Sequence, residues 1–254
     1  LSLHDALPIL NDLQTKHSDW LFGCLSYDLK NEVEALESKN NDNFPTDNML
    51  FFIPEYVLML KDGVLEIQTF NHKKVCDEFI FGFNFEKLKT KEFDCNIKQR
   101  DTKEAYVEKI KKIKNHIQLG DIYEMNYCQE FYATDVSFSA ESVFSELNNK
   151  MQTPFSSFLK LEKKYILSAS PERFLRKQGN KILSQPIKGT RKRGVSKEED
   201  EVLISALKTS SKDISENVMI TDLVRNDLSI TAKIASVKVK VLCEVYTFEK
   251  VHQM

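Results

Sequence analysis

The chain has 254 residues, of which 41% are hydrophobic and 29% charged, enough to bury the core of one large or two small globular domains. A formal net charge of -2 leaves no global basic field, which disfavours a nucleic-acid-binding or membrane-surface protein. The longest apolar run, residues 48–60, is interrupted by Pro54 and Glu55 and is shorter than the roughly 20 residues of a membrane span. We therefore expect a soluble protein whose partners include neither nucleic acid nor a membrane.

The cysteines point to a reducing compartment. They are odd in number, widely scattered and without a CxxC pair, which argues against a disulfide framework and against a zinc site. They are Cys24, Cys76, Cys95, Cys128 and Cys243. We expect a cytoplasmic location.

The first half of the chain predicts strands and then a helix. Residues 20–36 begin as an apolar strand-like run, and two β-rich runs flank residues 61–63, where Gly63 supplies the positive φ of a hairpin turn. Residues 71–100 are charged without a clear period and predict a surface connection. Apolar residues recur at helical spacing from 106 to 117, so we expect a helix that begins at Asp101 and ends at Gly120, and a strand from Ile122.

The second half predicts a meander followed by two helices. Residues 141–151 have a helical pattern, and residues 155–187 alternate short β runs with turns near 162–164 and 178–180. Ser196 with Glu199, and Asp213 with Glu216, are capping-box patterns that each predict a helix start. Helices interleaved with long antiparallel runs favour the α+β class over a parallel doubly wound sheet.

Lys188 is the first candidate for chemistry. It follows a β run within SQPIKGTRKRG, residues 184–194, and an amine attacks at neutral pH only when it is uncharged, which burial or neighbouring cations favour. Arg191, Lys192 and Arg193 are such neighbours in sequence. The alternative is that Lys188 is one more charge on a solvated basic loop.

Two carboxylates are further candidates. Glu172 lies where a β run meets a turn, and a strand of the same meander brings it toward Lys188, where a carboxyl group can exchange protons with the chemistry. Its alternative is a surface ion pair with Arg173 or with another surface cation. Glu216 lies in an apolar helical stretch, residues 216–228, predicted to be buried. Its acids either pair internally, complement the helix dipole, or offer oxygen ligands to a cation such as Mg²⁺.

Five stretches, taken in order and spacing, resemble the chorismate-utilising enzymes. They are GDIYEMNYCQEF (120–131), SASPERFL (168–175), QPIKGTRKRG (185–194), ENVMITDLVRNDL (216–228) and SVKV (236–239). The resemblance spans roughly residues 20–254. The para-aminobenzoate branch looks most similar, because anthranilate-forming relatives typically carry Ala at the position of Lys188, and because TPFSSFLKL (153–161) resembles that branch.

The resemblance implies an α+β fold of layered antiparallel sheets flanked by helices, with chorismate and Mg²⁺ in a cleft. It implies that Lys188 is the nucleophile, Glu172 the general acid/base and Glu216 a Mg²⁺ ligand, while Gly189 and Thr190 contact substrate. The expected reaction converts chorismate and ammonia into 4-amino-4-deoxychorismate, with a glutamine amidotransferase as the partner that supplies ammonia. The alternatives are an anthranilate synthase, or a non-catalytic module with an aromatic amino-acid pocket near WLFGCLSYDL (20–29).

The resemblance also implies boundaries and departures. We interpret residues 1–9 as a possible non-native segment, 10–95 as an N-terminal region of the component I type, and 96–254 as the N-terminal part of the chorismate-binding catalytic domain. Gln253 aligns with a family histidine, with His252 one place earlier. Family members continue beyond residue 254, so we expect this chain by itself to be incomplete and inactive. We also expect water to reach the apolar side chains beside Glu216, which are Val218, Ile220, Leu223 and Val224.

Overall fold

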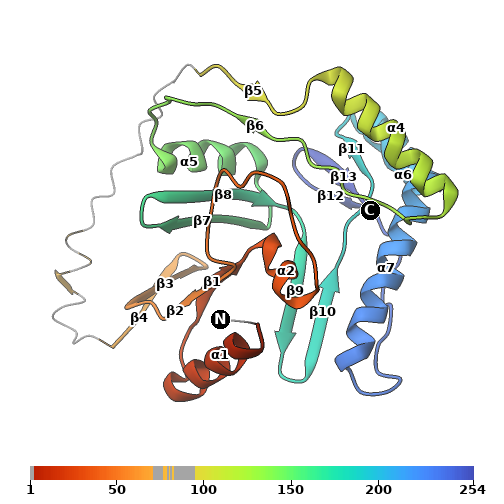
Figure 1. Ribbon diagram of the computed structural model, residues 1–254. Helices are drawn as coiled ribbons and strands as arrows, with labels where there is room; N and C mark the ends of the chain where they lie inside the picture. The colour runs from red at the N-terminus through yellow and green to blue at the C-terminus, as the bar shows by residue number, and fades with distance from the viewer. Residues whose placement is uncertain (1–2, 71–76, 79, 81, 83–94) are drawn as a thin grey trace. The chain divides into compact units, whose positions relative to one another are not determined.

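The computed structural model describes residues 3–70, 77, 78, 80, 82 and 95–254 (Figure 1). The chain divides into two compact units, Leu1–Phe85 and Glu86–Met254. Most of the connection predicted at residues 71–100 lies outside the described residues. Helices mix with small antiparallel sheets in the described parts, so the predicted α+β class is confirmed.

The described part of the first unit contains one longer helix and two antiparallel strand pairs. Its elements are α1 (Leu3–His17), β1 (Phe22–Leu25), the 3-10 turn η1 (Tyr27–Leu29), α2 (Lys30–Val33), β2 (Met49–Phe52), β3 (Tyr56–Lys61) and β4 (Val64–Thr69). β1 pairs with β2, and β3 pairs with β4. The predicted hairpin is confirmed: Asp62 and Gly63 have φ of 50° and 77°, as a two-residue turn with positive φ at both positions requires.

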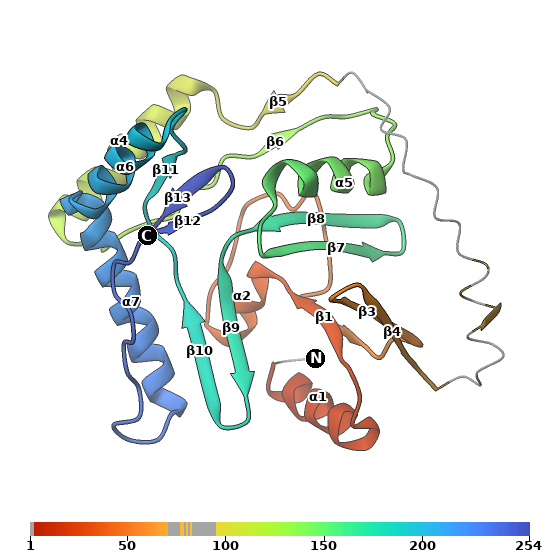
Figure 2. The same ribbon diagram turned by 180° about the vertical axis from the view of Figure 1, so that it is seen from behind.

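The second unit carries the remaining helices and sheets. Its elements are β5 (Lys98–Gln99), α4 (Lys103–Leu119), β6 (Phe131–Tyr132), α5 (Ala140–Met151), β7 (Phe155–Leu161), β8 (Lys164–Ser170), β9 (Arg173–Gln178), β10 (Lys181–Gln185), β11 (Thr190–Lys192), α6 (Lys197–Lys208), α7 (Ser211–Thr231), β12 (Tyr246–Thr247) and β13 (Val251–Gln253). β7 pairs with β8 and β9 with β10, so the predicted strands and turns are confirmed, but they form two separate antiparallel hairpins and not one continuous meander. β13 lies between β11 and β12, and α6 packs beside β11 (Figure 2).

Side-chain caps fix where the helices begin. Thr102 caps α4 by accepting a hydrogen bond from the backbone N of Ala105, and Gly120 ends it with φ of 81°, so the predicted end is confirmed and the start lies two residues after Asp101. Ser196 caps α6 as predicted. Ser210 caps α7, so the prediction that Asp213 opens this helix is wrong.

The strand predicted from Ile122 is also wrong, because residues 122–130 form no strand and β6 begins only at Phe131. A strand needs a neighbour for its backbone groups, and β6 pairs only with the two-residue β5. The described cysteines, Cys24, Cys95, Cys128 and Cys243, carry free thiols. None of the helices in the described residues is both long enough and apolar enough to span a membrane.

Candidate active site

Lys188 lies between β10 and β11, in a segment whose main chain forms two hydrogen bonds with Met254. Its backbone N donates to the carbonyl O of Met254 at 2.8 Å, and the backbone N of Met254 donates to the carbonyl O of Gly189 at 3.2 Å. The residue is half-buried. The end of β13 therefore fixes the backbone that carries the candidate nucleophile.

The structure brings Glu172 to the same place. β9 and β10 pair so that Arg173 faces Gln185, which puts the residues just outside the hairpin close together. Glu172 Oε1 accepts a hydrogen bond from the backbone N of Ile187 at 3.1 Å. The carboxylate of Glu172 thus lies beside the residue that precedes Lys188.

Arg173 contacts groups other than Glu172, so the alternative ion pair between these two residues is not formed. The Arg173 guanidinium donates from Nε to Gln185 Oε1 at 2.9 Å and lies over the ring of Phe155, 4.6 Å from its centroid. Glu172 is exposed to solvent.

Gly189 occupies a conformation and a space that suit only glycine. Its φ is +78°, and a Cβ placed there would lie 3.0 Å from Asp213 Cβ and 3.1 Å from Leu207 Cδ1. Thr190 begins β11, is exposed, and its Oγ1 accepts a long hydrogen bond from Gln253 Nε2 at 3.4 Å. The turn after Lys188 therefore lies against the end of α6 and the start of α7, and the Thr190 hydroxyl lies at the surface.

The two arginines of the loop pair with carboxylates. Arg191 Nη2 lies 2.7 Å from Asp213 Oδ2, and Arg193 Nη2 lies 2.5 Å from Asp200 Oδ2. Hydrogen bonds from Ser210 and from Arg191 lower the pKa of Asp213. Bonds from Arg193 and the backbone N of Gly194 hold the pKa of Asp200 far below its usual range. Both arginines act as anchors of the loop.

Glu216 lies in the second turn of α7, where it does not complement the first-turn dipole. Its Oε1 is 3.0 Å from Lys212 Nζ, and the side chain is 35% exposed. Asp222 pairs with Arg225 at 2.7 Å. Within the described ranges, no three His, Cys, Asp or Glu side chains gather to hold a metal ion.

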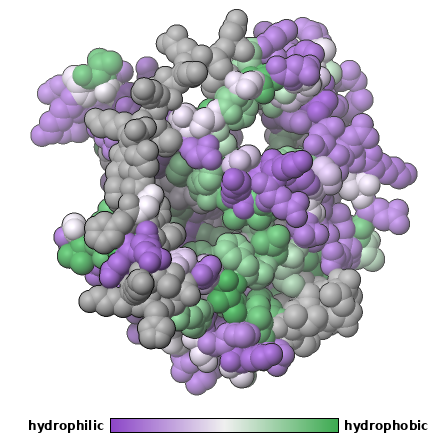
Figure 3. Space-filling view, turned by 90° about the vertical axis from the view of Figure 1, so that its left-hand side faces the viewer, coloured by the Kyte–Doolittle hydropathy of each residue, from purple (hydrophilic) through white to green (hydrophobic). Residues whose placement is uncertain are grey.

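Of the four apolar side chains of α7 that we expected water to reach, two are exposed. Val218 is 42% and Leu223 55% exposed, while Ile220 and Val224 are half-buried. The buried residues of the helix are polar, Asp213 and Asn217. Other large apolar side chains also reach the surface, and Figure 3 shows such green areas on the face that it presents.

Two residues of this region had no role in the sequence interpretation. Asp200 reads in sequence as an ordinary acid in the first turn of a helix, and His252 as a neighbour of the Gln253 motif. In the structure His252 Nε2 lies 3.0 Å from Asp200 Oδ1. No spacing signal joins residues so far apart in the chain.

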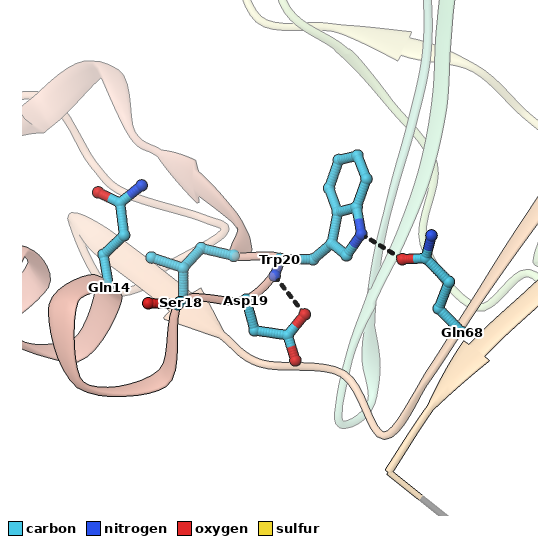
Figure 4. A pocket seen from close by; sticks show the side chains of 6 residues that line it. Gln14, Ser18, Asp19, Trp20 and Gln68 are labelled. Atoms are coloured by element: carbon cyan, nitrogen blue, oxygen red, sulfur yellow. Dashed lines mark hydrogen bonds between the residues drawn. The ribbon is translucent and has the colours of Figure 1, made fainter.

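A separate open cleft of about 510 Å³ lies in the first unit, close to the predicted aromatic amino-acid pocket. It is lined by Gln14, Ser18, Asp19, Trp20, Leu21 and Gln68. Trp20 Nε1 donates to Gln68 Oε1 at 2.7 Å, and the backbone N of Trp20 donates to Asp19 Oδ1 at 2.7 Å (Figure 4). The WLFGCLSYDL segment therefore does contribute to a cleft.

Comparison with known proteins identifies the family of the chain and several relatives. The family model described as chorismate binding enzyme matches residues 3–254. Aminodeoxychorismate synthase component 1 of Escherichia coli (strain K12) is 32% identical over 255 residues, covering 96% of this chain and 55% of that protein. Anthranilate synthase component 1 of Lactococcus lactis is 26% identical over 244 residues, covering 90% and 53%.

The fold has a relative among solved structures. Anthranilate synthase component I from Streptococcus pneumoniae superposes with a TM-score of 0.73 at 22% identity, covering 92% of this chain and 56% of that one. The chain spans about half the length of the curated relatives that it matches. Because the family model covers nearly every residue, from 3 to 254, the chain belongs to the chorismate binding enzyme family.

Proposed function

We propose that the intact protein is an aminodeoxychorismate synthase component 1, which converts chorismate and ammonia into 4-amino-4-deoxychorismate and water. The observation that carries the proposal is the hydrogen bond of 3.1 Å from the backbone N of Ile187 to Glu172 Oε1. It brings a carboxyl group and the Lys188 segment together at the base of one hairpin. The 32% identity to the Escherichia coli enzyme supports the choice of reaction.

In the proposed reaction the uncharged amine of Lys188 adds to the chorismate ring, and the C4 hydroxyl leaves. The Glu172 carboxyl protonates that hydroxyl, so that it departs as water. Ammonia then forms the new bond at C4 and the lysine is released. The Ile187 N–H holds one oxygen of the Glu172 carboxyl in place, and the pairing with Met254 holds the Lys188 backbone. Gly189 and Thr190 line the substrate side of the loop in this proposal.

Mg²⁺ and a partner complete the proposal for the intact protein. Glu216 is the one described carboxylate that we assign to the metal. The Lys212 amine lies 3.0 Å from Glu216 Oε1, and this ion pair has to break when Mg²⁺ binds to Glu216. A bound Mg²⁺ supplies positive charge for a substrate carboxylate. A glutamine amidotransferase supplies ammonia. We place the protein in the cytoplasm, where the free thiols of the described cysteines stay reduced.

The test is the product formed by the intact protein from chorismate, Mg²⁺ and ammonium, identified by mass spectrometry. Lys188→Ala should lower 4-amino-4-deoxychorismate formation by several orders of magnitude, because the covalent route requires the amine. Lys192→Ala is the matched control, since it removes an exposed cation of the same loop and should keep most of the activity. Normal turnover by Lys188→Ala refutes the role of Lys188.

Anthranilate synthase component I is the second candidate, favoured by the relative of Lactococcus lactis at 26% identity. The same incubation separates the two. Anthranilate is fluorescent and forms without a second enzyme, whereas 4-amino-4-deoxychorismate yields para-aminobenzoate only when a lyase is added. Anthranilate as the sole product refutes the first proposal.

A further inference from the structure

A buried hydrogen-bonded cluster lies next to the Lys188 loop and outside the groups that the proposed reaction uses. His252, at the centre of β13, is fully buried, with 0% of its surface exposed. Its Nε2 is 3.0 Å from Asp200 Oδ1 on α6, and its Nδ1 is 2.9 Å from Thr247 Oγ1 on β12. Three elements that are separate in sequence therefore meet at one imidazole ring.

Asp200 connects this ring to the loop that follows Lys188. The Asp200 carboxylate also accepts hydrogen bonds from Arg193 Nε at 2.9 Å and from the backbone N of Gly194 at 2.6 Å. Arg193 in turn donates from Nη1 to the carbonyl O of Phe248, in the turn between β12 and β13. We refer to Arg193, Asp200, Thr247 and His252 as the His252 cluster.

The direction of the hydrogen bonds follows from the charge on Asp200. Arg193 and the Gly194 N–H hold the pKa of Asp200 far below its usual range, so this carboxylate only accepts. His252 Nε2 must therefore carry the hydrogen and donate to Asp200. In the neutral ring Nδ1 then accepts from the Thr247 hydroxyl. Each polar atom of the ring has a partner, as a buried histidine requires.

The cluster reaches Lys188 through the main chain of β13. Two residues after His252, Met254 accepts from the backbone N of Lys188 at 2.8 Å and donates to the carbonyl O of Gly189 at 3.2 Å. β11 and β13 also pair with His252 opposite Arg191. The position of the His252 ring on α6 thus sets where β13 lies, and β13 sets where the Lys188 backbone lies.

We propose that His252 is a positioning residue for Lys188, acting through the Asp200 carboxylate and the main chain of Met254; the proposal rests on the function proposed above. A misplacement of about 1 Å far from the chemistry can cost about 100-fold in rate. Loss of the ring hydrogen bonds should therefore lower kcat about 100-fold and leave the KM for chorismate nearly unchanged, because the ring does not contact substrate.

The experiment compares His252→Leu, which removes both hydrogen bonds, with His252→Gln, whose amide can still donate to Asp200. Thr247→Val removes only the hydroxyl partner and serves if His252→Leu fails to fold. Thr209→Val is the matched control, since it removes a threonine hydrogen bond, Oγ1 to the Ser205 carbonyl at 2.9 Å, at the other end of α6. All are made in the intact protein.

Two readouts are needed. The first is amide hydrogen exchange of the peptide that contains Lys188, which should become roughly tenfold faster in His252→Leu, with β7 and β8 unchanged. The second is kcat and KM. The proposal predicts that His252→Gln restores most of the slow exchange at Lys188 and most of kcat. Thr247→Val should give exchange rates and kcat values between those of the wild type and His252→Leu, and Thr209→Val should match the wild type.

The remaining outcomes refute either the positioning role of His252 or the proposed function, and the two cases can be told apart. If amide exchange at Lys188 is unchanged in His252→Leu, the link between His252 and Lys188 is refuted, whatever the activity of the variant. If His252→Leu does not fold, unchanged exchange in Thr247→Val refutes the link in the same way. Faster exchange with unchanged kcat overturns the positioning role. A wild-type protein that makes no 4-amino-4-deoxychorismate refutes the proposed function, and the exchange data then still decide whether His252 holds the Lys188 segment.

Discussion

Replacing Gly189 by alanine should destabilise the protein through two separable effects. The φ of +78° costs about 1–2 kcal/mol for a residue with a Cβ. The new Cβ would lie 3.0 Å from Asp213 Cβ and 3.1 Å from Leu207 Cδ1, contacts that both neighbours must relieve. Such overpacking costs about 1–3 kcal/mol. We therefore expect the free energy of unfolding to fall by about 2–5 kcal/mol, a large share of the roughly 5–15 kcal/mol of a typical domain.

Gly179→Ala is the matched control for this measurement. Gly179 also has a positive φ, +55°, but nothing lies within 4 Å of its Cβ position. Its substitution should cost only the conformational part, about 1–2 kcal/mol. Alanine narrows the unfolded ensemble equally at both sites, so this effect cancels in the comparison. Urea unfolding with linear extrapolation gives both values. Equal losses in the two variants would show that the contacts of Gly189 with Asp213 and Leu207 carry no energetic weight.

Further predictions concern the carboxylates and the cleft of the first unit. Glu172→Gln should lower kcat by about 10²–10⁴-fold, because an amide cannot protonate the leaving hydroxyl; a normal rate in a product assay contradicts its role. Glu216→Gln should raise the Mg²⁺ concentration needed for half-maximal activity, and an unchanged Mg²⁺ titration removes it from the metal site. Because the pKa of Asp200 is lowered in the folded state, its ionised carboxylate stabilises that state at pH values above about 3.9, its pKa in the unfolded chain. This stabilisation is lost as the pH falls below that value toward the pKa of the folded state. Asp200→Asn should therefore make the melting temperature depend less on pH in the acid range. Tryptophan should release or absorb heat in calorimetry if the cleft beside Trp20 binds an aromatic amino acid, and Trp20→Ala should abolish that heat.

Local signals in the sequence predicted local structure well. Gly63 and Gly120 end up with φ of 77° and 81°, because a two-residue hairpin turn and a helix C-cap both need the left-handed region. The start of α7 was misplaced for an equally local reason. Ser210 and Asp213 occupy the capping positions that the sequence interpretation gave to Asp213 and Glu216, since both pairs have the same spacing and only the backbone decides between them.

Contacts between residues distant in sequence were predictable only where one β-hairpin connects the two residues. Glu172 approaches Ile187 because β9 and β10 form one hairpin, and the sequence shows both of its strands and its turn. Asp200 and His252 are joined by no such continuous element. Their contact depends on β13 pairing with β11, which no turn signal specifies, and a carboxylate in the first turn of a helix already has an ordinary explanation in the helix dipole.

The cations around Lys188 show how charge along a sequence differs from charge in space. Arg191 lies 2.7 Å from Asp213 at the start of α7, and Arg193 lies 2.5 Å from Asp200 on α6. Each guanidinium is opposed by a carboxylate that is itself shielded from solvent, with 7% and 15% of the side chain exposed. Carboxylates in such positions are costly unless they are paired, so each arginine is needed by the fold where it lies. Arg191 and Arg193 therefore anchor the β11 segment to two helices, so their charges belong to the packing of the fold.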